Sequence, residues 1–71
     1  MKQSIAQRIR QARTKKEIDQ AKLAAKLDVA TRTAQRWEKG EQVPDRNYLM
    51  RIAKATGVTP HWLLTGEGDL Y

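Results

Sequence analysis

The stretch QAKLAAKLDVATRTAQRWEKG, residues 20–40, decides how this chain folds. Its first eight residues place three apolar side chains at helical spacing, Leu23, Ala24 and Leu27. Asp19 stands in front of them as a candidate N-cap, and Asp28 follows as a turn residue that can adopt the left-handed conformation at some cost. We therefore expect a short amphipathic helix over about residues 20–27.

The rest of the stretch has one apolar face and one basic face. On a wheel of about 100° per residue, three apolar side chains share one narrow sector, Ala30, Ala34 and Trp37. The opposite side carries Arg32, Arg36 and Lys39, with Gln35 on its flank. This pattern predicts a second helix over about residues 30–38, ended by Gly40, with one face for burial and one for an anionic partner. Two such short helices are unstable alone in water, so the remaining chain must pack against them.

Three more helices are expected around this pair, and no strand. The first covers about residues 2–15, with Ile5, Ile9 and Ala12 on its apolar line. The fourth covers about 46–56 and has the clearest stripe, formed by Leu49, Ile52, Ala53 and Thr56. The fifth starts at Pro60 after the candidate N-cap Thr59, carries Trp62, Leu63 and Leu64, and is closed by Gly66. We place both tryptophans in the core, and we expect one all-α domain over residues 1–66 and a short tail over 67–71.

Composition narrows the functional classes. The 71 residues hold no cysteine, one histidine and one serine, and no Gly-rich phosphate loop or metal-ligand spacing occurs, so we expect neither an enzyme nor a metal or cofactor site. Without a long apolar run or signal peptide, a cytoplasmic protein is expected. The net charge is +6, with +7 in residues 1–39 (eleven bases, four acids) and −1 in residues 40–71 (three bases, four acids). The positive field therefore belongs to the half that holds the two-helix segment.

An ordered series of residues resembles the lambda-type repressor and Cro (Xre-like) group of helix-turn-helix DNA-binding domains. The resemblance covers about residues 5–66 and is carried by Arg13, Gln20, Ala24, Val29, the WEKG of residues 37–40, Pro44 and the GVTPHWLLTG of residues 57–66. It implies a compact five-helix bundle whose second and third helices form the DNA-reading motif. Three positions depart from the usual pattern of the group: Asp28 replaces Gly, Ala30 replaces a Ser or Thr cap, and Ala34 replaces a larger branched residue.

The resemblance also implies roles for individual side chains in the major groove. Expected base contacts are Thr31, Arg32, Gln35 and Arg36. Expected phosphate contacts are Gln20, Lys39, Gln42, Arg46, Asn47 and, secondarily, Arg13. Arg13 is expected first to form a partly buried structural salt bridge with Glu38.

These expectations favour a transcriptional regulator of phage or prophage type, binding a palindromic operator in double-stranded DNA as a homodimer. The fourth and fifth helices with Leu70 or Tyr71 are the expected dimer contacts. Three alternatives remain open: the DNA-binding head of a longer self-cleaving repressor, an antitoxin whose main partner is a toxin protein, and a non-specific RNA or nucleoid binder. No membrane, small-molecule ligand or cofactor is expected.

Overall fold

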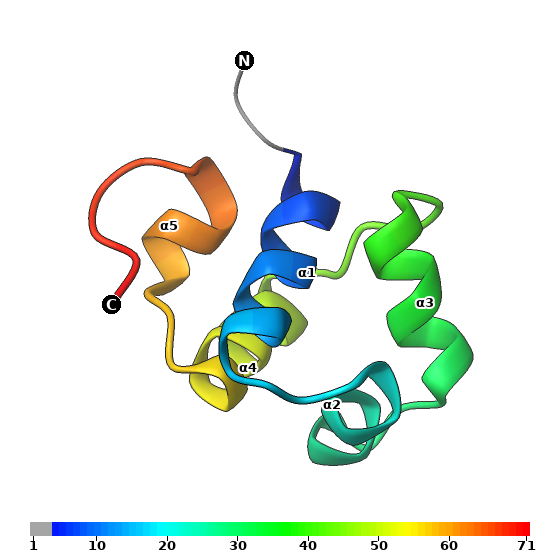
Figure 1. Cartoon of the computed structure of the whole chain (residues 1–71). Helices are drawn as coiled ribbons and strands as arrows, with labels where there is room; N and C mark the ends of the chain where they lie inside the picture. The colour runs from blue at the N-terminus through cyan, green and yellow to red at the C-terminus, as the bar shows by residue number, and fades with distance from the viewer. Residues whose placement is uncertain (1–3) are drawn as a thin grey trace.

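The computed structural model describes residues 4–71, and all regular secondary structure in that part of the chain is helical (Figure 1). The helices are α1 (Ile5–Lys15), α2 (Gln20–Leu27), α3 (Thr31–Lys39), α4 (Arg46–Thr56) and α5 (Pro60–Thr65). This confirms the predicted all-α, five-helix fold. The predicted start of the first helix at residue 2 lies outside the described residues, and α3 begins at residue 31 rather than 30.

Short polar side chains set the starts of four helices. Each accepts a hydrogen bond from a backbone N–H in the first turn, which has no carbonyl partner within the helix. These caps are Ser4, Asp19, Asp45 and Thr59, and Ser4 forms a full capping box with Gln7. The exception is α3, where Ala30 occupies the cap position and supplies no side-chain hydrogen bond. Asp28 ends α2 in the left-handed region with φ 57°, as its place in the sequence predicts.

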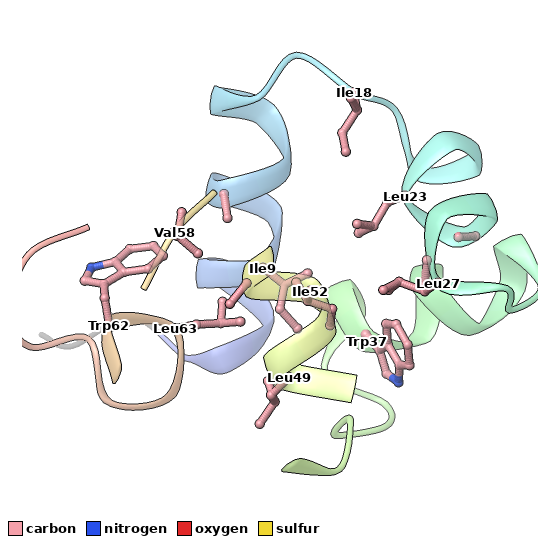
Figure 2. Close-up of a cluster of buried hydrophobic side chains, with 14 residues drawn as sticks. Ile9, Ile18, Leu23, Leu27, Trp37, Leu49, Ile52, Val58, Trp62 and Leu63 are labelled. Carbon is pink, nitrogen blue, oxygen red and sulfur yellow. The ribbon is translucent and has the colours of Figure 1, made fainter. Parts of the chain in front are cut away.

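Helix α1 is the central element of the bundle. It packs against α3, α4 and α5, while α2 packs against α3 and α4. Figure 1 shows α3 on one side of α1 and α5 on the other. The apolar stripes of the helices meet in one core, in which Ile9, Leu23 and Ile52 are completely buried (Figure 2). Trp37 and Trp62 both lie in this core, as predicted.

A buried arginine joins the first helix to the last. The Arg8 side chain lies on the same face of α1 as Ala12 and is 4% exposed. Its Nε donates to the Leu63 carbonyl at 2.7 Å and its Nη2 donates to the Leu64 carbonyl at 2.9 Å. Desolvation by burial lowers the pKa of Arg8 from its ordinary value. Arg8 therefore satisfies carbonyls near the end of α5, a role that the sequence analysis missed although the residue lies on the apolar side of the α1 wheel.

The last five residues fold back on the bundle. The Thr59 N–H donates to the Leu70 carbonyl at 2.8 Å, and the Thr59 hydroxyl donates to the Asp69 carbonyl at 2.7 Å. Leu70 is partly buried against the core, whereas Tyr71 is 69% exposed. The predicted end of helix at Gly66 agrees with the structure, but the segment after it is held against the start of α5.

Candidate nucleic-acid interface

The outward face of α3 presents a cluster of long polar side chains. Arg32, Gln35, Arg36 and Lys39 surround one shallow hollow, and all four are exposed. Thr31 is exposed at the first position of the helix. Glu41, which follows the helix, lines the same hollow and was not singled out from the sequence. Three of the five lining side chains are cationic, so this face carries the positive field that the charge distribution predicts.

The opposite face of α3 is fixed in the core. Ala34 is completely buried and Trp37 is 2% exposed. The Trp37 ring packs at a tilt against the Tyr48 ring of α4, with 5.4 Å between centroids. Gly40 ends α3 at φ 78°, a left-handed conformation in which other residues are strained. The core packing of α3 therefore fixes the rotation of this helix about its own axis, and with it the direction in which the exposed cluster points.

An ion pair ties α3 to α1. Arg13 Nε donates to Glu38 Oε2 at 2.8 Å, and Arg13 Nη2 donates to Glu38 Oε1 at 3.0 Å. The two side chains are 15% and 3% exposed, so the pair is largely removed from water. The third nitrogen of Arg13, Nη1, donates to the Ile18 carbonyl at 3.0 Å. The expected bridge thus forms with bidentate geometry, and every nitrogen of the Arg13 side chain already has a partner within the protein.

A second polar hollow lies beside this ion pair, where α1, α2 and α3 meet. Gln20, Lys39 and Arg10 line it together with Asp19 and the bridged pair. The Gln20 amide donates to Glu38 Oε1 at 3.3 Å, which orients the first side chain of α2. Arg10 is exposed here and was missed in the sequence, although its position three residues before Arg13 puts both on one face of α1.

The remaining predicted phosphate contacts are not gathered in these two hollows. Gln42 lines a separate pocket between α1 and the loop that follows α3. Arg46 lines a groove between α4 and α5 instead of the α3 face. Asn47 is exposed in the first turn of α4. The structure therefore brings Gln20 and Lys39 beside the α3 cluster and places Arg46 elsewhere.

Among residues 4–71, no group of three or more His, Cys, Asp or Glu side chains could hold a metal ion. No helix in this part of the chain is long and apolar enough to cross a bilayer.

Comparison with known proteins supplies the family. Residues 9–63 match the family model described as helix-turn-helix. The chain is 34% identical over 65 residues to the repressor protein C2 of Salmonella phage P22, covering 92% of this chain and 30% of that protein. It is 45% identical over 47 residues to an uncharacterized HTH-type transcriptional regulator of Haemophilus influenzae, covering 66% of this chain and 20% of that protein.

Solved structures agree with the sequence comparison. The crystal structure of the P22 c2 repressor bound to a synthetic operator superposes with a TM-score of 0.84 at 34% identity, covering 92% of this chain and 98% of that one. The chain spans between a fifth and a half of the length of the curated relatives it matches, with 49% for the DicA regulator of Escherichia coli. On these grounds the chain belongs to the helix-turn-helix family of the lambda-repressor type.

Proposed function

We propose that this chain is a sequence-specific, double-stranded DNA-binding domain of a transcriptional repressor, in which α3 lies in the major groove. The observation that carries the proposal is the cluster of Arg32, Gln35 and Arg36 on the exposed face of a helix whose other face is buried. A major groove about 12 Å wide admits one helix. Arginine can pair two donors with guanine O6 and N7, and glutamine can do the equivalent with adenine. Thr31, at the helix start, completes the set of proposed base contacts.

Phosphate contacts position the helix without reading sequence. Gln20 and Lys39 suit this role because they line the hollow beside the α3 cluster. Gln42 and Asn47 follow the helix-turn-helix motif in the sequence and are exposed, so they are proposed to contact DNA phosphates farther along the duplex. Arg13 is proposed to act chiefly through its bridge to Glu38, and Arg46 is the weakest member of the set because it lines a different groove.

A homodimer is proposed because two copies of α3, one on each half-site, read a palindromic operator. The groove between α4 and α5 supports this, since Met50 and Leu64 line it and are 55% and 46% exposed. Residues 40–71 carry a net charge of −1 (three bases, four acids), so two copies can meet there without the repulsion of the basic half. Sedimentation of the protein across a concentration series, alone and with operator DNA, tests this part. A single protein chain in both cases at all concentrations contradicts it.

A second architecture keeps the same DNA-reading role. In it the chain is the DNA-binding head of a longer repressor, and the favouring observation is that it covers only 30% of the P22 C2 repressor. The phage or prophage setting of the proposal rests on the same relative.

Selection of bound duplexes from a random pool tests the proposed function. The expected result is an enriched motif with two symmetric half-sites whose centres lie about one helical turn, or a multiple of it, apart. Lys54 is an exposed base on α4 outside both hollows, so Lys54→Ala serves as a control variant and is expected to enrich the same motif. Failure to enrich any motif contradicts sequence-specific DNA binding. So does an affinity for unrelated duplex or structured RNA that equals the affinity for the selected duplex.

A further inference from the structure

The Trp37 indole is buried with an unused hydrogen-bond donor. The residue is 2% exposed, and its Nε1 has no hydrogen-bond partner among the described residues. Buried donors in native proteins nearly always have an acceptor, because leaving one unpaired destabilises the fold. In Figure 2 the nitrogen lies on the edge of the ring that points away from Leu27. The Trp37 Nε1–H is therefore a donor that an acceptor from a binding partner could satisfy.

The ring borders a small pocket between α1 and the loop that follows α3. The pocket has a volume of about 230 Å³. Its wall on one side is the first turn of α1, with Ile5 and Ala6, and on the other side the loop, with Gln42 and Val43. Helix geometry gives the amides of Ile5 and Ala6 no carbonyl within α1, and the start of a helix carries partial positive charge. Among residues 4–71 no carboxylate lines the pocket, so its lining does not repel an anionic acceptor.

We propose that this pocket receives a phosphate of the DNA backbone, with the Trp37 indole N–H as its buried donor. The inference rests on the proposed function and adds a phosphate contact that comes from the core face of α3. The pocket adjoins the end of the DNA-reading helix, since Gly40 also lines it and Lys39 precedes that residue. The donors that residues 4–71 offer to a phosphate there are uncharged, so the contact fixes the depth of α3 in the groove without a cation from this lining.

Access to the nitrogen requires a movement of the loop. The indole Nε1 atom has less than 1 Å² of accessible surface in the free protein. Gln42 is exposed and Val43 is 67% exposed, so displacing them sacrifices little buried surface. The contact is therefore made only as DNA binds, and the environment of the Trp37 N–H changes at that moment.

Trp37→Phe tests the donor, because it keeps an aromatic ring and removes the N–H. Removal of a hydrogen bond to a charged acceptor is expected to lower the affinity about tenfold or more. The loss is expected to be equal on a selected duplex and on an unrelated duplex, since a phosphate carries no sequence information. Trp62→Phe is the matched control: the same change in a core residue of α5, outside this pocket, is expected to leave both affinities unchanged. Wild-type affinity of a folded Trp37→Phe variant overturns the inference.

A second measurement does not need the Trp37→Phe variant. In a proton–nitrogen correlation spectrum of the Trp62→Phe protein, the one remaining indole signal belongs to Trp37. Duplex is expected to move its proton resonance downfield, and inorganic phosphate at the same phosphate concentration is expected not to move it. A signal that stays in place with duplex, or moves equally with inorganic phosphate, overturns the inference. If the wild-type protein binds no duplex at all, the proposed function fails instead, so the two failures are distinguishable.

Discussion

Removal of the Glu38 carboxylate is the perturbation whose cost the structure defines best. Glu38→Ala leaves the Arg13 guanidinium without its two charge-assisted hydrogen bonds, at 2.8 and 3.0 Å, in a site where its side chain is only 15% exposed. Breaking a buried pair from one side costs about 3–5 kcal/mol, and we expect the lower end because Arg13 keeps its bond to the Ile18 carbonyl. A domain of this size has a total stability of roughly 4–10 kcal/mol. About 3 kcal/mol is thus a large share of it.

Thermal unfolding followed by circular dichroism measures this loss. At about 4–8 °C per kcal/mol, the melting temperature of Glu38→Ala is expected to fall by roughly 12–24 °C. Glu41→Ala is the matched control, because Glu41 is an exposed acid that follows the same helix, and its removal is expected to change the melting temperature little. The double variant Arg13→Met with Glu38→Leu is expected to recover part of the loss, since no unpaired charge remains. A Glu38→Ala melt that coincides with the wild-type melt refutes the buried-pair reasoning.

Three further outcomes are expected. Glu17 and Asp28 both have left-handed backbone conformations, at φ 62° and 57°, so glycine at either position should raise the melting temperature. The increase should be larger at position 17, because aspartate tolerates this conformation better than glutamate. A lower melting temperature for both variants contradicts backbone strain at these positions. Ala30→Ser supplies the cap that α3 lacks and should add about 1 kcal/mol to the free energy of unfolding in urea; no gain means that the serine does not cap. Duplex affinity, measured by fluorescence anisotropy, should fall at least about tenfold between roughly 50 and 200 mM salt, because Arg32, Arg36 and Lys39 displace counterions from the DNA. An affinity that does not change with salt indicates a protein partner instead.

Helix positions could be predicted because the local signals agree with one another. The apolar stripe of α4, for example, consists of the four residues that the structure buries, Leu49, Ile52, Ala53 and Thr56. Asp19 and Thr59 cap the helices that they precede, and Gly66 follows the last turn of α5. The expected bounds of α3 differ from the observed ones by one residue, because Ala30 occupies the cap position and the helix itself begins at Thr31.

Features that depend on the meeting of distant segments were harder to predict. Arg8 was overlooked because its partners are backbone carbonyls 55 and 56 residues away, which no sequence pattern displays. Arg46 is the first residue of α4 and has the charge of a phosphate contact, but its side chain lines the groove between α4 and α5. The Arg13–Glu38 bridge was expected only through resemblance to a family, since two charges 25 residues apart carry no local sign of contact.

The central claim is that α3 reads bases, and Arg36→Ala tests it most directly. The measurement is the ratio of affinity for a selected duplex to affinity for an unrelated duplex at one salt concentration, in wild type and variant. A lost bidentate base contact costs about 1–3 kcal/mol on the selected duplex alone, so the ratio is predicted to fall by roughly 5- to 150-fold. An unchanged ratio, with both affinities reduced together, would show that Arg36 only holds phosphate and would contradict the account.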